Sequence, residues 1–284
     1  MSKASTMVVK EAATLEELRT IIHEKQEGED VLVVNTAHCS AEEFTTRVKQ
    51  AKGLVADFDG TLHAGSQWKY VRGILPPELA EEDLQAAMRY FDKNEETHSD
   101  FEDIQFILGS VQRMVAGCIT HKHLSNGAGS MTPRHGACEL IDSFGNASTI
   151  VSFGMWDFIR SWGHQWLHRD VSVSALRLRF SGGNPDFVSG CDPLTVVSDG
   201  NKGYIYFTFR AVHGLADEEV LVLGDAPTDI KMMRPGGLGV LILPHADPQI
   251  GRQGSRWEAL PRLWPRVAAC LLSDSLEGLA HMRR

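Results

Sequence analysis

Residues Leu54–Leu62 read LVADFDGTL, and this stretch decides the fold class. An apolar run leads directly into two carboxylates, Asp57 and Asp59, which Gly60 follows. In open α/β sheets, functional groups gather where the parallel strands reach their carboxyl ends. The pattern therefore predicts a buried strand that delivers two acidic side chains to a site at the edge of a sheet.

A second stretch of the same kind, residues 220–229, reads VLVLGDAPTD. Either stretch alone often marks a turn or a helix cap, so the prediction rests on both together. Carboxylates that converge at one sheet edge repel one another, and a hard divalent cation relieves that repulsion. We therefore expect a bound Mg²⁺, which requires the side chains of residues 57 and 225 to lie within about 10 Å of each other. The expected metal ligands are Asp57, Asp59, Asp225 and Asp229.

The rest of the chain extends this pattern to a whole sheet. Further short apolar runs, separated by helical patterns, occupy residues 31–34, 149–151 and 240–243. Such runs are typical of a parallel sheet that is covered on both faces, so we predict a doubly wound α/β fold. The interval 64–134 has helical periodicity and predicts a small inserted helical domain. Residues 202–212 fit either a strand or a helix.

The composition of the chain limits which partners and which cellular compartment we expect. The 284 residues carry a formal net charge of −9, which disfavours a nucleic-acid partner because binding to a phosphate backbone needs a basic face. No apolar run reaches the roughly 18 residues of a membrane helix, and no signal peptide is recognised at the start. Five cysteines without a Cys-x-x-Cys pair favour a reducing compartment, so we expect a cytoplasmic protein with no membrane partner. The oligomeric state is left open.

Taken in order, the motifs resemble those of the haloacid dehalogenase-like (HAD) superfamily of phosphotransferases. The first motif is DFDGTL at 57–62, the second is IVSFG at 150–154, the third is Lys202 and the fourth is GDAPTD at 224–229. The resemblance covers residues 52–244. It implies a Rossmann-like catalytic core of residues 53–63 and 136–284, a helical cap of residues 64–135, and an extension of residues 1–52 packed on the core. The cap looks like that of phosphoserine phosphatases and cytosolic pyrimidine 5′-nucleotidases.

The resemblance also implies a Mg²⁺-dependent phosphomonoester phosphatase that acts on a small phosphorylated metabolite. Asp57 is then the nucleophile that forms an aspartyl-phosphate, and it also touches the metal. Asp59 is the general acid and base, with its main-chain carbonyl on the metal. Asp225 binds the metal, while Asp229 supports the metal shell or the lysine. The implied phosphate-binding residues are Gly60, Ser152, Phe153, Gly154 and Lys202.

Substrate recognition is the least determined part of the sequence. A guanidinium at Arg134 could clamp a carboxylate or a second phosphate, and His63 and Trp68 are further candidates for substrate contact. Other candidates in the insertion are Gln67, Lys69, Glu95, Glu96 and Arg113. Amino-acid, nucleotide and sugar phosphates all stay open as substrates. The alternatives to a phosphatase are a phosphotransferase or mutase of the same fold and a non-enzymatic binding protein of the HAD fold.

Overall fold

The structure, a computed structural model, describes residues 7–26, 28–91, 99–243 and 256–284. They form two compact units. The first unit draws on residues 1–64, 133–148 and 203–284, and the second on residues 65–132 and 149–202. The second unit thus contains residues 65–132 of the predicted insertion together with residues 149–202.

Strands of the first unit follow the order β1-β2-β9-β8-β7-β3. Their bounds are Val8–Ala12 for β1, Val31–Asn35 for β2, Gly53–Ala56 for β3, Val220–Gly224 for β7, Leu238–Leu243 for β8 and Ala269–Leu272 for β9. Neighbours pair in parallel except for the antiparallel pair β2–β9. Every residue of β2, β3, β7, β8 and β9 is buried, as expected for strands covered on both faces. The predicted α/β class with a mostly parallel sheet is confirmed.

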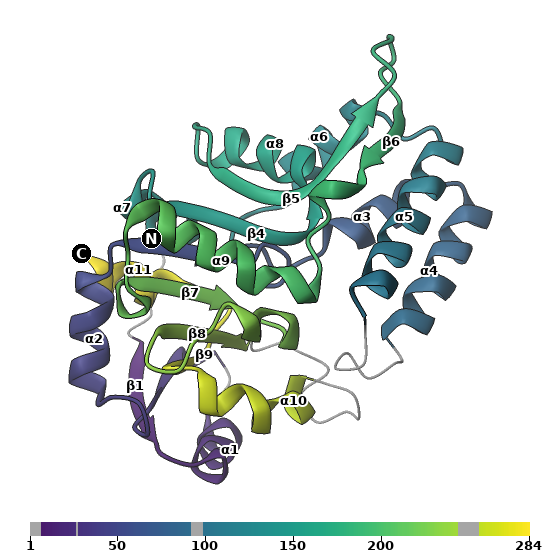
Figure 1. Ribbon diagram of the computed structural model, residues 1–284. Helices are drawn as coiled ribbons and strands as arrows, with labels where there is room; N and C mark the ends of the chain where they lie inside the picture. Colours follow the sequence, from purple (N-terminus) through teal and green to yellow (C-terminus); the bar gives the residue numbers. More distant parts are fainter. Residues whose placement is uncertain (1–6, 27, 92–98, 244–255) are drawn as a thin grey trace. The chain divides into compact units, whose positions relative to one another are not determined.

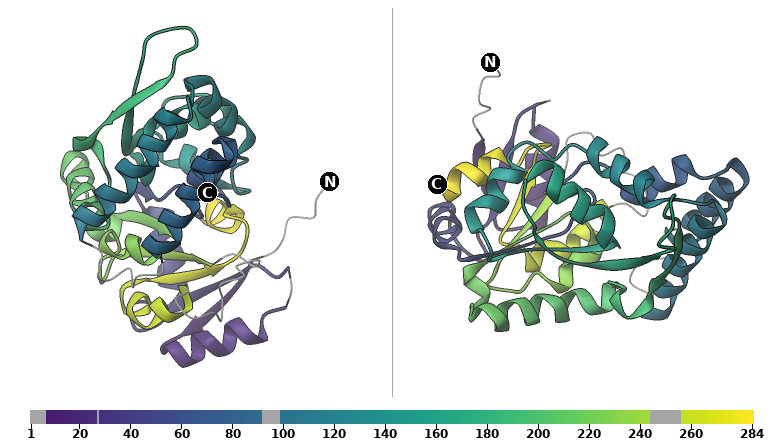
Figure 2. Two further views of the ribbon diagram at one scale, coloured as in Figure 1. Left: turned by 90° about the vertical axis from the view of Figure 1, so that its right-hand side faces the viewer. Right: turned by 90° about the horizontal axis from the view of Figure 1, so that it is seen from above.

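Helices cover this sheet. Their bounds are Leu15–Glu24 for α1, Ala41–Gln50 for α2, Ala137–Phe144 for α7, Asp199–His213 for α9, Arg256–Leu263 for α10 and Glu277–Arg283 for α11. The helix α11 packs against both α2 and α7 (Figure 1). The part of α9 in the first unit packs on β3. A Cβ built on Gly53 of β3 would lie 3.1 Å from the ring of Phe209 in α9. β1 and α1 lie at the edge of the sheet (Figure 2).

The second unit contains the helical insertion and strands of the nine-stranded sheet. Its helices are α3 (Gln67–Ile74), α4 (Pro77–Phe91), α5 (Asp100–Ala116), α6 (His121–Ser130) and α8 (Trp156–Trp166). Its strands are β4 (Ser148–Met155), β5 (Ser172–Phe180) and β6 (Val188–Asp192). β4 and β5 are parallel, whereas β5 and β6 form an antiparallel hairpin that is visible in Figure 1. The predicted helical character of the interval 64–134 is confirmed for its described residues, 64–91 and 99–134.

A buried carboxylate ties three helices of the insertion together. Asp83 of α4 is 3% exposed and accepts hydrogen bonds from Arg72 of α3 at 2.8 Å and from Arg113 of α5 at 2.9 Å. A buried acid that accepts from two guanidinium groups is held far more firmly than a surface ion pair. Arg113, one of the candidate substrate contacts, therefore takes part in holding the insertion together.

One alternative that the sequence left open receives a definite answer. Residues 202–212, which fit either type of element, belong to helix α9. Among the described residues, no helix is long and apolar enough to cross a membrane.

Candidate active site

The acidic cluster is built by two adjacent parallel strands. Ala56 at the end of β3 is aligned with Leu223 in β7, and the main-chain N–H of Asp57 donates to the carbonyl of Leu223 at 3.0 Å. Asp57 and Asp225 are each the first residue after their strand. Both side chains therefore leave the sheet at the same carboxyl edge, where open α/β sheets place their sites.

Three carboxylates meet at this edge. Asp57, Asp225 and Asp229 each offer an oxygen atom, and these atoms lie within 4.8 Å of one another. Their exposed fractions are 6%, 2% and 0%, so water screens their mutual repulsion poorly. The requirement that residues 57 and 225 lie close together is met. A buried set of carboxylate oxygens is the donor set that fits a hard divalent cation such as Mg²⁺.

Asp229 shapes the loop that carries Asp225. It lies in the short 3₁₀ helix η4 (Pro227–Lys231), and its Oδ2 accepts the main-chain N–H groups of Asp225 at 3.0 Å and Ala226 at 3.1 Å. Gly224 is required here, because a Cβ at that position would overlap the carboxylate of Asp229. Asp229 thus fixes the main chain at the end of β7.

The glycine after the first pair of acids is equally constrained. Gly60 has a φ of +80°, and a Cβ built on it would overlap the carboxylate of Asp225. The hydroxyl of Thr61 donates to Oδ1 of Asp225 at 3.1 Å. The loop after β3 therefore approaches the fourth motif closely enough to orient its aspartate. Thr61 was not among the predicted site residues, although it stands inside the first motif.

Asp59 differs from the other three acids. It is half-buried, and the cluster found among the described residues does not include its carboxylate. The resemblance had implied this difference, since it gave Asp59 a main-chain contact with the metal and a role as general acid and base. The general acid and base role implied for Asp59 stays a prediction.

The second motif lies in an irregular part of β4. Ser152 is 1% exposed, its Oγ accepts the N–H of Gly154 at 3.0 Å, and the register of β4 shifts between Val151 and Met155. Gln67 of α3 accepts the N–H of Met155 at 2.7 Å, and its amide fills the space that a Cβ of Gly154 would need. Gln67, predicted as a possible substrate contact, thus supports the main chain of this motif.

Phe153 of the second motif belongs to an aromatic stack. Phe153 is half-buried, and its ring stacks on those of Phe106 in α5 and Tyr90 in α4, with centroids 6.4 and 6.2 Å away. Tyr90 and Phe106 are themselves stacked at 4.4 Å. The phosphate-binding role predicted for Phe153 and Gly154 would use their main chain, because the Phe153 side chain packs against the insertion.

The third motif is held by acids that the sequence analysis did not identify. Lys202 is 2% exposed and lies in the first turn of α9. Asp100 of α5 accepts from the hydroxyl of Ser198 at 2.9 Å and from the N–H of Gly200 at 3.0 Å. Asp103, also in α5, accepts the N–H of Asp199 at 2.9 Å. Carboxylates stabilise a helix N-terminus through such bonds, so α5 fixes the turn that carries the lysine.

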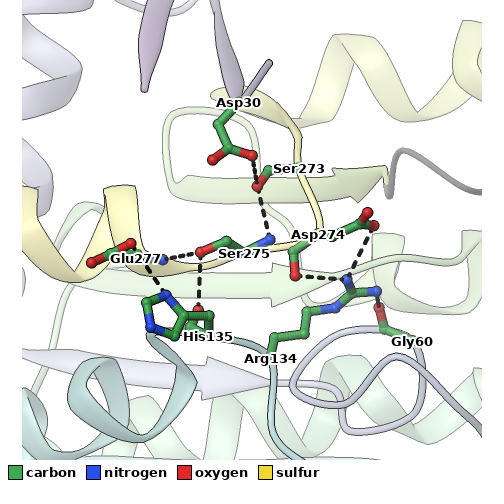
Figure 3. Close-up of polar contacts among 8 residues, drawn as sticks. All are labelled: Asp30, Gly60, Arg134, His135, Ser273, Asp274, Ser275 and Glu277. Atoms are coloured by element: carbon green, nitrogen blue, oxygen red, sulfur yellow. Dashed lines mark hydrogen bonds and ion pairs between the residues drawn. The ribbon is translucent and has the colours of Figure 1, made fainter. Parts of the chain in front are cut away.

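The candidate substrate contacts are scattered. Arg134 is buried, belongs to the first unit, and donates to the carbonyl oxygens of Gly60 at 2.8 Å and Asp274 at 3.3 Å (Figure 3). This is a different use of its guanidinium from the predicted substrate clamp. His63 is 9% exposed, and its ring centroid lies 6.1 Å from that of Phe58. Of the others, Trp68 is half-buried and Lys69 exposed, while Glu95 and Glu96 lie outside the described residues.

One carboxyl near the second motif has a shifted pKa. Asp157 lies in the first turn of α8, and its Oδ2 accepts the N–H of Leu178 at 3.0 Å. Burial raises the pKa of Asp157 above its ordinary value, and the hydrogen bond from Leu178 offsets part of this effect.

Comparisons with known proteins identify solved structures with a similar fold. No protein-family model and no curated protein sequence matches the chain. Cytosolic 5′-nucleotidase IIIB bound to cytidine superposes with a TM-score of 0.62 at 16% identity, over 94% of this chain and 96% of that one. A phosphoserine phosphatase, solved as an analogue of its phospho-aspartyl intermediate, gives 0.51 at 20% identity, over 68% and 87%. A HAD family hydrolase from Salmonella enterica gives 0.54 at 17% identity, over 72% and 66%.

The chain shares the fold of these three proteins. The HAD fold was expected from the four motifs, and the acidic cluster lies where the first and fourth of them meet. At these identities the likeness establishes the fold, and the chemistry has to be argued from the residues of this chain.

Proposed function

We propose that this protein is a Mg²⁺-dependent phosphatase that hydrolyses phosphomonoesters of small metabolites through an aspartyl-phosphate. The observation that carries the proposal is the buried cluster of Asp57, Asp225 and Asp229 at the carboxyl ends of β3 and β7 in a HAD-like fold. Three buried carboxylates are costly to keep together without a cation. A cation there would also favour the approach of a phosphate dianion, which the acids alone would repel.

The residues of the chain suffice for a two-step reaction. A carboxylate oxygen of Asp57 attacks phosphorus, the bond to the ester oxygen breaks, and Asp59 gives its proton to the departing alkoxide. Asp59 then takes a proton from water, whose oxygen attacks the same phosphorus and releases inorganic phosphate and free Asp57. Mg²⁺, when bound, would offset the negative charge of the phosphoryl oxygens and of the nucleophile.

We infer that Ser152 and Lys202 complete the site by binding phosphoryl oxygens. Contacts within the first unit support this inference. The N–H of Leu54 in β3 donates to the carbonyl of Ala147 at 2.9 Å, just before β4 begins. Gly203, which follows Lys202, lies so near η4 that a Cβ on it would be 2.9 Å from the carbonyl oxygen of Lys231. Lys231, which lies in η4 beside the fourth motif, is exposed, and this favours Lys202 as the phosphate ligand.

Replacement of the nucleophile tests the proposal. We expect Asp57→Asn to lower the rate of p-nitrophenyl phosphate hydrolysis by on the order of 10³-fold or more, because the amide cannot form the acyl phosphate. Asp170→Asn is the matched control, since that carboxylate is 71% exposed and pairs only at the surface. EDTA should abolish the activity, and added Mg²⁺ should restore it. A wild-type rate for Asp57→Asn would refute the mechanism.

The same assay separates the alternatives. Release of inorganic phosphate from a panel of amino-acid, nucleotide and sugar phosphates identifies a phosphatase and its substrate class. A phosphorylated acceptor among the products would instead indicate a phosphotransferase or mutase. Absence of both turnover and Mg²⁺ binding by calorimetry would indicate a binding protein that uses the HAD fold.

A further inference from the structure

We propose that Arg134 is a positioning residue that holds the loop of the first motif in place by joining it to the carboxyl-terminal segment Ser273–Glu277. The effect on turnover rests on the proposed function, whereas the effect on the loop does not. Arg134 had been a candidate for substrate contact because a guanidinium recognises anions. Its surroundings in the structure point to another role.

The guanidinium of Arg134 lies inside the first unit and bridges two segments. Only 2% of its side chain is exposed. Nη2 donates to the carbonyl of Gly60 at 2.8 Å, while Nη1 donates to the carbonyl of Asp274 at 3.3 Å and lies 3.8 Å from its carboxylate (Figure 3). A charged group is buried only where hydrogen bonds replace its hydration. Burial of the guanidinium therefore depends on its hydrogen bonds to the carbonyl groups of Gly60 and Asp274, and these bonds in turn restrain the two segments.

On one side, these contacts fix the loop after the nucleophile. The main-chain N–H of Arg134 also donates to the carbonyl of Leu62 at 2.8 Å, so the arginine holds the loop at two points. Between them lies Thr61, whose hydroxyl orients Asp225, and Gly60 itself leaves no room for a Cβ beside that carboxylate. A change in the path of the loop at Gly60 would thus move both the general acid Asp59 next to it and the ligand Asp225.

On the other side, the carboxyl-terminal segment is a set of capped turns. The hydroxyl of Ser273 donates to Asp30 and accepts the N–H of Ser275 at 2.8 Å, and the hydroxyl of Ser275 accepts the N–H of Glu277 at 3.0 Å (Figure 3). These side-chain bonds order the segment between β9 and α11. The carbonyl of Asp274 is thereby presented to Arg134 from a segment that is itself fixed.

The neighbours of Arg134 in sequence join the same cluster. The carbonyl of His135 accepts the N–H of Leu276 at 2.7 Å, and its Nδ1 lies 3.1 Å from a carboxylate oxygen of Glu277. Gly136 has a φ of +82°, and a Cβ on it would overlap the main chain of Glu277. The chain before α7 and the chain before α11 therefore pack main chain against main chain, which leaves little freedom for the arginine between them.

A positioning role and a substrate clamp predict different kinetics. If Arg134 holds the loop, its loss misplaces the reacting groups and lowers kcat, while KM changes little. If Arg134 binds the substrate equally in the ground and transition states, its loss raises KM and leaves kcat unchanged. We expect Arg134→Met to lower kcat by about 10- to 100-fold, with KM within about twofold of wild type, and Arg134→Lys to recover part of kcat. Arg160→Met, on an arginine that is 47% exposed, is the matched control.

Hydrogen–deuterium exchange tests the loop without reference to turnover. In Arg134→Met we expect faster exchange in residues 58–63 and 274–277 and unchanged exchange in α5. A raised KM with unchanged kcat and unchanged exchange would overturn the proposal in favour of a substrate clamp. If the wild-type protein hydrolyses no phosphomonoester, the proposed function fails, and the exchange result still decides the role of Arg134.

A second variant keeps the proposal falsifiable if Arg134→Met does not fold. Ser273→Ala leaves the arginine in place and loosens only the segment that it joins to the loop. We expect this variant to exchange faster both in residues 274–277 and in residues 58–63. Faster exchange confined to residues 274–277 would show that the segment does not support the loop, and would overturn the proposal.

Discussion

The substitution Gly60→Ala tests the geometry of the acidic cluster directly. Two separate penalties arise at this position. A left-handed φ of +80° costs an alanine about 1–2 kcal/mol, and the new Cβ would overlap the carboxylate of Asp225. Because carbon and oxygen atoms need more than about 3 Å between them, Asp225 has to move away, and a displacement near 1 Å lowers turnover by about 100-fold.

Gly236 provides a control that isolates the clash from the backbone strain. Its φ is also +80°, but a Cβ built there has no atom within 4 Å. Gly236→Ala should therefore lose about 1–2 kcal/mol of unfolding free energy and keep both activity and Mg²⁺ affinity. Gly60→Ala should lose at least as much stability and, in addition, most of the activity and of the affinity for Mg²⁺.

The measurements are thermal or urea unfolding, calorimetric titration with Mg²⁺, and phosphate release. Wild-type Mg²⁺ affinity and turnover in Gly60→Ala would refute the reasoning, because they would show that Asp225 is not where a metal ligand has to be. Equal loss of activity in both variants would attribute the effect to general destabilisation instead.

Two further substitutions probe the second unit. Asp103→Ala removes the acceptor for the N–H of Asp199 and for the hydroxyl of Tyr90. We expect the unfolding free energy to fall by about 1–3 kcal/mol. We also expect a lower kcat, because the turn that carries Lys202 loses one of the bonds that fix it. Asp157→Asn tests how the unfolding free energy depends on pH. Burial raises the pKa of the Asp157 carboxyl in the folded state above its ordinary value of 3.8, so the wild type loses unfolding free energy as pH rises from 3.8 through the raised pKa. The melting temperature of Asp157→Asn should therefore gain on that of wild type as pH rises above the ordinary carboxyl value of 3.8, and a difference that is independent of pH would contradict the shift.

The sequence was sufficient to predict the strands that carry the acids. In β3 and β7 an unbroken apolar run ends in an aspartate, and burial on both faces of a parallel sheet produces such runs. The clustering of Asp57 and Asp225 followed from the rule that parallel strands end at a common edge. These predictions needed only local pattern and a topological rule.

One strand was missed and one helix was left undecided, each for an identifiable reason. In β5 the alternation of Leu176 and Leu178 with Arg177 and Arg179 is a period-of-two signal that could have revealed the strand. In α9 the aromatic and β-branched residues between Lys202 and Val212 favour a strand by propensity, and tertiary packing overrides that preference.

The contacts of Arg134, Asp100 and Asp103 could not be predicted from the sequence. Arg134 and Asp274 are separated by 140 residues, and Asp100 and Ser198 by 98. No local pattern records such a pairing, since a buried arginine and a substrate-binding arginine look alike in one sequence. Their roles depend on which distant carbonyl or N–H the fold brings near, and only the structure supplies that.

The division of the chain into units has a practical consequence for exchanging parts between related proteins. The chain passes between the units after residues 64, 132, 148 and 202. The last two boundaries fall within β4 and α9, whereas the first two fall in stretches outside any helix or strand. Grafting residues 65–132 from a nucleotidase or a phosphoserine phosphatase would therefore interrupt none of the described helices and strands of the chain that receives them.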